Sequence, residues 1–345
     1  MKTAGRFPVG WALTAGEERL LTLPLSTVLR NMLITGTTGW GKSGAVLSLI
    51  LTALTKFRPI GVVLVDGKGE TAHELVENFL PALAESHPHL DPSQVAIVKP
   101  FGRRYGIELN PLYPIPGIDA AVQAHIVASL IAELAEGNVG PRMKSLLSSL
   151  CHVGIVARAT LLDLLGALRE PTQAEALASR VPDEELRHYL TEVFPREPAA
   201  SKDALRARLE WLLLIPEIRA MLCSPTAVSG SALLEAPLTV VDLGGDIPLG
   251  FLSLAQVIGS WITTVLTAAV FCRTTPAHPV MFVIDEWQVV VGKSAAELER
   301  MLSQARFRSV NLVLANQTLG QITDTSLLRS LLTNISLHWA FRPGE

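Results

Sequence analysis

Short runs of nearly continuous apolar residues recur along the chain and predict the strands of a buried sheet. The runs cover residues 31–36, 60–66, 94–99, 238–243, 280–285 and 311–316. Because apolar and polar positions do not alternate within them, the runs are typical of strands that are covered on both faces. Helical patterns follow three of these runs, over residues 42–57, 70–84 and 295–306. The alternation of strands and helices predicts an α/β fold with a mostly parallel central sheet.

Residues 117–223 follow a different pattern. No apolar run there predicts a strand, and prolines interrupt the helical segments. Thr172 and Glu175 have the spacing of a capping box, which predicts that one of these helices opens there. We therefore expect an all-helical insertion subdomain at 117–223, set into a domain formed by residues 1–116 and 224–345.

One apolar stretch raises the question of a membrane span. Residues 251–272 carry no formal charge over 22 positions, which is long enough to cross a bilayer. Hydroxyl and amide side chains interrupt the stretch, and it lies between two predicted strands. It therefore favours a buried core helix, with no integral membrane span. The first twenty residues contain no long apolar run, so no signal peptide is expected.

Composition excludes several classes of protein. Apolar residues make up 49% of the chain and charged residues 18%, which excludes a disordered or fibrous protein. The net charge of −3 argues against nucleic-acid binding through bulk positive charge. The 3 cysteines form no CxxC pair. A disulfide framework and a structural zinc site are therefore not expected, and a reducing, cytoplasmic environment fits.

The strongest chemical signal is a phosphate-binding loop. Residues 36–43 match the pattern GxxxxGK[ST], directly after a predicted strand and at the start of a predicted helix. In this motif backbone N–H groups surround the β-phosphate, the lysine reaches the β- and γ-phosphates, and the hydroxyl binds Mg²⁺. Lys42 and Ser43 take these two roles. The expected nucleotide-binding residues are Gly36, Thr37, Thr38, Gly39, Trp40, Gly41, Lys42, Ser43 and Gly44.

A second acidic motif complements this loop. Asp285 and Glu286 follow the apolar run at 280–284, which is typical of a Walker B strand. Asp285 is expected to bind Mg²⁺, and Glu286 to orient or deprotonate the attacking water. Gln317 ends the next strand and could sense the γ-phosphate. Alternatively, Asn316 and Gln317 simply end that strand with polar residues.

These motifs together resemble the FtsK/HerA superfamily of RecA-like ATPases, and in particular the coupling proteins of type IV secretion and conjugation. The loop LITGTTGWGKS is close to the family form, and LVDGKGE at 64–70 is similar to the D-P-K-G-E run of coupling proteins. An NPL motif at 110–112, LANQT at 314–318 and NISLHWAFR at 334–342 extend the resemblance over nearly the whole chain. The segment that begins at Gly140 resembles the helical insertion of those proteins.

The resemblance implies an ATP- and Mg²⁺-dependent motor that forms a ring, in most members a hexamer, and translocates DNA. In such rings a neighbouring subunit supplies an arginine to the γ-phosphate, and Arg306, Arg308 and Arg342 are the candidates here. Lys68 and Glu70 could couple hydrolysis to movement or form a local ion pair. Arg103 and Arg104 form a weak candidate for contacts to DNA phosphates.

The resemblance also leaves alternatives open. Asn31 and His338 depart from residues common in the family, and the transmembrane pair of membrane-anchored coupling proteins and the N-terminal barrel of HerA are not found. The leading expectation is a motor for conjugative or integrative-element transfer, cytoplasmic or peripheral at the inner membrane, with a secretion apparatus or a relaxase as partner. The rivals are a HerA-like motor partnered with a nuclease in repair or phage defence, and an ATP-binding adaptor that recruits protein substrates.

Overall fold

The computed structural model describes residues 5–14, 17–37, 39–57, 59–101, 107–133, 140–244, 252–287, 295–318 and 325–341. The chain forms two compact units. The first comprises Met1–Val98, Gly230–Gly245 and Ala269–Glu345, and the second comprises Lys99–Ser229 and Asp246–Ala268. The sequence-based domain boundaries at residues 117 and 223 stay a prediction.

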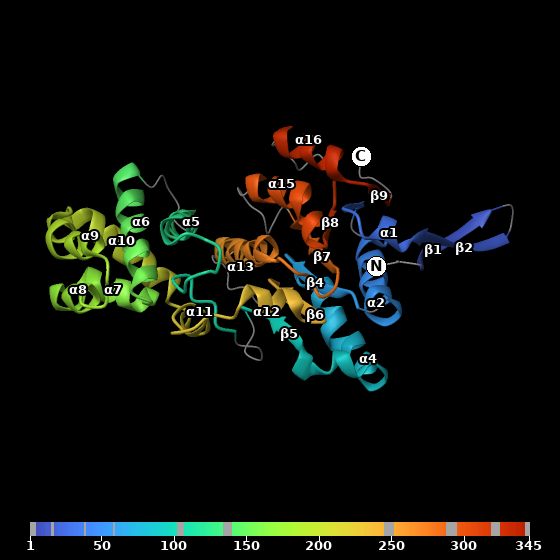
Figure 1. The fold of residues 1–345 in the computed structure, drawn as a ribbon, viewed down its shortest axis with the longest axis horizontal. Coiled ribbons are helices and arrows are strands. Elements are labelled where there is room, and N and C mark those ends of the chain that lie inside the picture. The colour runs from blue at the N-terminus through green and yellow to red at the C-terminus, as the bar shows by residue number, and fades with distance from the viewer. Residues whose placement is uncertain are drawn as a thin grey trace. The chain divides into compact units, whose positions relative to one another are not determined.

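A seven-stranded sheet forms the centre of the first unit (Figure 1). Its strand order is β5-β6-β4-β7-β8-β3-β9, and every neighbouring pair is parallel. The strands are β3 (Met32–Thr35), β4 (Gly61–Asp66), β5 (Val95–Val98), β6 (Leu238–Asp242), β7 (Val280–Asp285), β8 (Val310–Asn316) and β9 (Leu337–Ala340). The predicted α/β fold with a parallel sheet is therefore confirmed, and each apolar run forms a strand.

Both faces of the central strands are buried, as their continuous apolar runs predict. Alternate residues, among them Met32, Leu64 and Met281, contribute to one core cluster. Their neighbours on the opposite face, such as Val63 and Phe282, have no exposed surface. Burying each side chain of this kind contributes about 1.5–3 kcal/mol, so the sheet is held from both sides.

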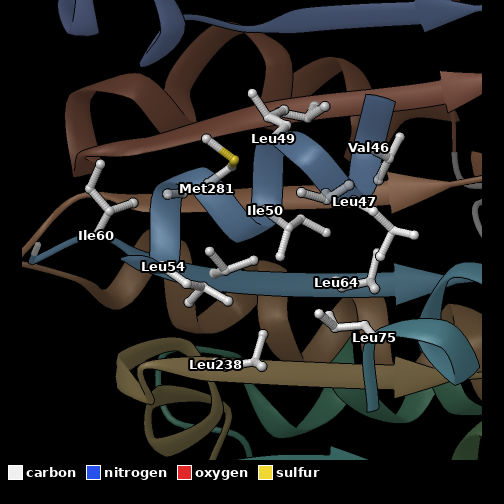
Figure 2. Packing of buried hydrophobic residues seen from close by; sticks show 14 of the residues in the cluster. Val46, Leu47, Leu49, Ile50, Leu54, Ile60, Leu64, Leu75, Leu238 and Met281 are labelled. Carbon is white, nitrogen blue, oxygen red and sulfur yellow. The ribbon is translucent and has the colours of Figure 1, made fainter. Parts of the chain in front are cut away.

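Helix α2 (Lys42–Lys56) covers one face of the sheet. Its side chains, among them Ile50 and Leu54, lie against the strands that carry Leu64, Leu238 and Met281 (Figure 2). The helix starts directly after the phosphate-loop motif, so this packing fixes the motif at the carboxyl end of β3.

The other described helices that lie wholly in the first unit are short. They are α1 (Leu25–Val28), α3 (Glu70–His73), α4 (Leu80–Ser86), α12 (Gly230–Glu235), α15 (Ala295–Gln304) and α16 (Thr325–Asn334). A π-helical segment, Glu74–Phe79, joins α3 to α4, and 3₁₀ turns cover Pro88–Leu90, Pro92–Gln94 and Ala305–Arg308.

The sequence patterns missed an antiparallel hairpin near the N-terminus. Strands β1 (Arg6–Thr14) and β2 (Glu17–Pro24) pair with a register shift between Pro8 and Gly10. In Figure 1 they extend away from α1 and α2. Most β2 side chains are exposed, so this strand lacks the buried face from which strands are recognised. Phe7 is the exception, since it is fully buried and stacks on Phe57 with ring centroids 5.0 Å apart.

The second unit is helical within the residues described. Its helices are α5 (Ala120–Glu133), α6 (Pro141–Val156), α7 (Leu161–Arg169), α8 (Pro171–Ala178), α9 (Glu184–His188), α10 (Ala199–Leu212), α11 (Pro216–Leu222) and the greater part of α13 (Leu252–Cys272). A π-helical segment, Tyr189–Val193, and a 3₁₀ turn, Phe194–Arg196, follow α9.

The capping box predicted at Thr172 is wrong. Helix α8 already begins at Pro171, with Glu170 at the N-cap, so Thr172 lies inside the first turn. A capping box instead opens α7, where Thr160 and Asp163 hydrogen-bond to each other's backbone N–H groups at 3.4 and 2.7 Å. Proline at the first helical position fixes the start of α8 without a side-chain cap.

Helix α13 contains the stretch that raised the question of a membrane span. Leu254–Cys272 is the one helical segment of the described chain that is long and apolar enough to cross a bilayer. However, 72% of its most apolar window is buried within the protein. This burial is consistent with the core helix predicted from the sequence.

Candidate functional site

The phosphate-loop motif lies between β3 and the first turn of α2. Gly39 and Gly41 adopt φ values of +84° and +92°, which glycine reaches without a steric penalty. Gly41 is the N-cap of α2, so the N–H groups and the positive end of the helix dipole face this loop. A Cβ atom on Gly36 would lie 2.6 Å from Cβ of Phe341, so the loop packs directly on the residue that follows β9. The arrangement can hold a phosphate group.

Lys42 is buried at this edge and pairs with two carboxylates. Its Nζ atom lies 2.9 Å from Oδ1 of Asp285 and 2.7 Å from Oε1 of Glu286. Burial by itself lowers the pKa of Lys42, but the charges and hydrogen bonds of the two carboxylates outweigh burial and raise that pKa. Lys42 is therefore charged and neutralises the acidic end of β7.

Glu286 lies directly after β7 in a strained backbone conformation. Its φ of +52° falls in the left-handed region, which is uncommon for a residue with a side chain. The carboxylate is buried and also receives Lys68, whose Nζ atom lies 3.1 Å from Oε1. Burial raises the pKa of Glu286, but Lys42 and Lys68 more than offset this and hold the pKa below its ordinary value. Strain of this kind is often found at functional sites.

Asp285 ends β7 with both of its oxygens in hydrogen bonds. Oδ2 accepts a 2.8 Å hydrogen bond from the hydroxyl of Thr71, and Oδ1 accepts from Lys42 and from the backbone N–H of Glu286. Thr71 belongs to α3, which follows β4, the strand beside β7 in the sheet. One carboxylate thus connects the ends of two neighbouring strands and the phosphate loop.

Asp66 ends β4 and is almost fully buried beside Asp285. Its oxygens accept hydrogen bonds from the backbone N–H groups of Lys68 and Ala72, each at 2.9 Å. Burial and the charge of Asp285 raise the pKa of Asp66 to about 6, although the backbone hydrogen bonds act in the opposite direction. Asp66 therefore binds a proton at a higher pH than an ordinary aspartate does, because its ionised form is buried and lies beside the charge of Asp285.

The turn after β4 packs closely on the end of β6. Gly69 has a φ of +81°, and a Cβ atom there would overlap the carboxylate of Asp242 and the backbone of Gly244. A Cβ atom on Gly244 would in turn overlap the carbonyl group of Lys68. The turn at residues 67–69 thus packs on the end of β6, and on the other side the N–H of Gly67 donates a 3.1 Å hydrogen bond to the carbonyl group of Asp285 at the end of β7.

These groups surround one open cavity of about 230 Å³. Its lining residues are Thr37, Gly39, Gly41, Lys42, Ser43, Gly44, Asp66, Lys68, Glu70, Thr71, Asp285 and Glu286. The structure therefore brings most of the predicted phosphate-loop residues together with the two predicted carboxylates. Trp40 is 51% exposed and does not line the cavity, and Thr38 lies outside the described residues.

Gln317 follows β8, which lies between the phosphate-loop strand β3 and the acidic strand β7. It is half-buried and does not line the cavity. Thr35 and Asn316 are register partners at the ends of β3 and β8, so Gln317 lies at the same edge of the sheet as the phosphate loop. Its predicted contact with a γ-phosphate stays a prediction.

Arg306 lies at the opposite edge of the sheet. It is exposed on the 3₁₀ turn before β8, and Ser309 in the same segment accepts a hydrogen bond from the N–H of Val280 at the start of β7. Arg306 is thus remote from the cavity of its own chain. Arg308 donates to the carbonyl group of Arg273 and supports the fold. Arg342, Arg103 and Arg104 lie outside the described residues.

Three residues of the site were not singled out from the sequence. Asp66 and Thr71 belong to or follow the LVDGKGE motif, but their contact with the acidic end of β7 depends on the strand order. Phe341 lies within the predicted last strand, and its N–H donates a 2.8 Å hydrogen bond to the carbonyl group of Thr35. Since no motif encodes which strands are neighbours, the sequence carried no signal for these contacts.

Comparison with solved structures identifies the fold. The unbound form of the bacterial conjugative coupling protein TrwBdeltaN70 matches 95% of this chain and 71% of its own, at 16% identity and a TM-score of 0.55. TrwB in complex with ADP and Mg²⁺ matches 91% of this chain and 69% of its own, at 14% identity and a TM-score of 0.55. VirB4 of Thermoanaerobacter pseudethanolicus matches 95% of this chain and 82% of its own, at 14% identity and a TM-score of 0.62.

Sequence comparison adds nothing to this result, because no protein-family model and no curated protein sequence matches the chain. The structural matches span both units over almost the full length, while identity stays at or below 16%. The chain therefore has the α/β RecA-like P-loop fold that the structures of TrwB and VirB4 share.

Proposed function

We propose that the protein is an ATP-hydrolysing motor of the FtsK/HerA type that translocates DNA in conjugative or integrative-element transfer. The observation that carries the proposal is the pairing of Lys42 with both Asp285 and Glu286 at the carboxyl edge of the sheet. A phosphate-loop lysine, a metal-binding aspartate and a water-activating glutamate are the groups that P-loop hydrolases bring together.

The residues present fit a nucleotide with Mg²⁺. Gly39 and Gly41 shape a loop that opens onto a helix N-terminus, and Lys42 supplies the cation for the β- and γ-phosphates. Ser43 and Asp285 would hold Mg²⁺, which binds oxygen ligands and keeps several waters. Structures of TrwB with ADP and Mg²⁺ and with a non-hydrolysable ATP analogue support this choice of ligands.

The chemistry assigned to the chain follows from the charges at this edge. When bound, Mg²⁺ neutralises charge on the phosphate oxygens. Lys42 then exchanges its carboxylate partners for the phosphates, and Glu286 orients the attacking water and accepts its proton. Gln317 reads the γ-phosphate from the end of β8.

Assembly into a ring, most simply a hexamer, completes the proposed site. Arg306 is exposed at the edge of the sheet opposite the cavity, so any contact that it makes with a γ-phosphate must be to the nucleotide of a neighbouring subunit. Arg342 is the other candidate for this role. An arginine supplied in trans accelerates phosphoryl transfer by about 10³–10⁵-fold in characterised cases.

The experiment that tests the proposal is steady-state ATP hydrolysis, measured with and without single- and double-stranded DNA at two salt concentrations. We expect DNA to stimulate hydrolysis and Lys42→Ala to abolish it. The stimulation should weaken as the salt concentration rises, because contacts to DNA phosphates are salt-dependent. Lys42-dependent hydrolysis that no DNA affects, in a protein shown by light scattering to be assembled, would overturn the DNA-motor proposal and leave an ATPase of another kind.

A further inference from the structure

Lys68 is the second cation at the cavity and has no part in the proposed reaction so far. Among the described residues that line the cavity, the only cationic side chains are Lys42 and Lys68. The Nζ atom of Lys68 lies 3.1 Å from Oε1 of Glu286, and Lys42 contacts the same oxygen at 2.7 Å. One carboxylate oxygen of Glu286 thus forms ion pairs with two lysines.

The two lysines differ in how they are held. The side chain of Lys42 is 7% exposed, whereas that of Lys68 is 42% exposed. The backbone of Lys68 is nevertheless fixed, because its N–H donates to Asp66 and its carbonyl group packs on Gly244. An exposed ammonium group has little need of a buried partner, since water solvates it well. The buried Glu286 carboxylate is the group that gains from this contact.

Nucleotide binding changes the balance between the two contacts. Lys42 belongs to the phosphate loop and is drawn to the phosphates when nucleotide binds. Lys68 belongs to the turn after β4, which is wedged against Gly244 independently of the loop. After Lys42 has left, Lys68 is the described cation that still holds the Glu286 side chain.

We propose, as an extension that rests on the proposed ATPase function, that Lys68 is the positioning residue for Glu286. It fixes the carboxylate through Oε1 and so sets the orientation in which Glu286 meets the attacking water. Lys68 itself does not bind the phosphates in this assignment, so it acts on the chemical step and not on nucleotide affinity. The strained φ of Glu286 places the side chain within reach of Lys68, and the ion pair then selects one orientation of the carboxylate.

The test compares Lys68→Ala and Lys68→Arg with the wild-type protein. Lys68→Ala is expected to lower kcat by about 10–100-fold, the usual effect of removing a group that orients a site residue, while KM for ATP changes less than about twofold. Lys68→Arg is expected to recover most of kcat, since a cation returns to Oε1. Lys56→Ala, which removes an exposed lysine from the far end of α2, is the matched control and should leave both constants unchanged.

A binding measurement makes the test independent of turnover. ADP with Mg²⁺ and aluminium fluoride mimics the transferring phosphoryl group, whereas ADP with Mg²⁺ alone does not. Calorimetric titration should show that Lys68→Ala binds the aluminium fluoride complex about tenfold or more weakly but binds ADP as the wild type does, because positioning acts in the transition state. An equal loss of affinity for both ligands would overturn the proposal and identify Lys68 as a phosphate ligand.

Other outcomes also separate the two proposals. Wild-type kcat and wild-type binding of both ligands in Lys68→Ala would overturn the positioning role while the ATPase proposal stands. A higher kcat in Lys68→Ala would show that Lys68 restrains Glu286 from acting, which also overturns it. If the wild-type protein binds neither ligand in a Lys42-dependent manner, both the ATPase function and the role of Lys68 are wrong.

Discussion

The hydroxyl of Thr71 donates a 2.8 Å hydrogen bond to Oδ2 of Asp285. Both residues are buried, with 1% and 3% of their surface exposed. Thr71 follows β4 and Asp285 ends β7, so this bond joins the LVDGKGE motif to the acidic motif of the neighbouring strand. The turn after β4 therefore supports Asp285, the carboxylate proposed to bind Mg²⁺, as well as Glu286.

Replacing Thr71 by valine keeps the shape of the side chain but removes this hydrogen bond. A buried carboxylate oxygen is then left without its donor, which costs about 1–3 kcal/mol of unfolding free energy. Urea unfolding without nucleotide measures the loss. Thr71→Ser keeps the hydroxyl and should retain most of the stability. Equal unfolding midpoints for the valine variant and the wild type would show that the bond is not formed in solution.

Three glycine substitutions separate backbone strain from steric overlap. Gly140 is an N-cap residue with φ −60°, and no atom lies within 4 Å of the position that a methyl group would occupy. Gly140→Ala should therefore leave the stability nearly unchanged.

Gly39 has a φ of +84° but open space around it, so Gly39→Ala should cost about 1–2 kcal/mol from the left-handed conformation alone. Gly69 has a φ of +81° and a methyl group there overlaps Asp242 and Gly244, so Gly69→Ala should cost clearly more than Gly39→Ala. The midpoints of urea unfolding give the order of stability of the three variants. A Gly69 variant as stable as the Gly39 variant would contradict the close packing of the turn against β6.

Lys42→Ala has an effect on stability that is separate from its effect on nucleotide binding. Asp285 loses the ion pair with Lys42, and Glu286 loses its contact with Lys42 and keeps the contact with Lys68, so buried negative charge is less well compensated. Removing one member of a buried pair typically costs about 3–5 kcal/mol. Urea unfolding without nucleotide or Mg²⁺ should show this loss, and adding Asp285→Asn should restore part of it. No recovery in the double variant would mean that the cost comes from packing and not from charge.

The architecture could be predicted from the sequence because its strands are covered on both faces. Continuous apolar runs such as 61–66 and 280–285 are typical of strands that are buried on both faces, and each forms a strand of the parallel sheet. The hairpin Arg6–Pro24 was not predicted because the side chains of β2 are largely exposed and β1 contains Pro8 and Gly10. Sequence periodicity reveals strands through their buried positions, so a strand with few buried side chains is not recognised from it.

Some residues of the site could be predicted from local motifs, whereas contacts between residues of the site depend on the order of the strands. Lys42, Asp285 and Glu286 each lie at a strand end that a short motif marks, so they could be named from the sequence. The contacts of Thr71 with Asp285 and of Lys68 with Glu286 need β4 to lie beside β7, although these strands are separated by more than 200 residues. No local pattern encodes that pairing.

Asp66 makes a pH-dependent contribution to the stability of the folded protein. The sign of this contribution is opposite to that of an ordinary acid paired with a cation. Burial and the charge of Asp285 raise the pKa of Asp66 from 3.8 to about 6. The folded state therefore binds this proton more tightly than the unfolded state does. The resulting stabilisation is fully present below pH 3.8 and is lost as the pH rises through about 6.

Asp66→Asn carries no charge at any pH and isolates this contribution. The stability of the wild type relative to Asp66→Asn should fall by about 2 kcal/mol between about pH 4.5 and pH 7.5, in the absence of nucleotide and metal. A constant offset from the altered hydrogen bonds to Lys68 and Ala72 does not change this slope. Urea unfolding of both proteins across the pH range gives the difference directly.

Asp91→Asn is the matched control for this measurement. Asp91 is exposed, and hydrogen bonds from Ser93 hold its pKa below the ordinary value, so it is ionised over most of this pH range in the folded and unfolded states alike. The difference between wild type and Asp91→Asn should therefore be nearly flat over the same range. A flat difference for Asp66→Asn as well would mean that Asp66 is ionised beside Asp285 at low pH.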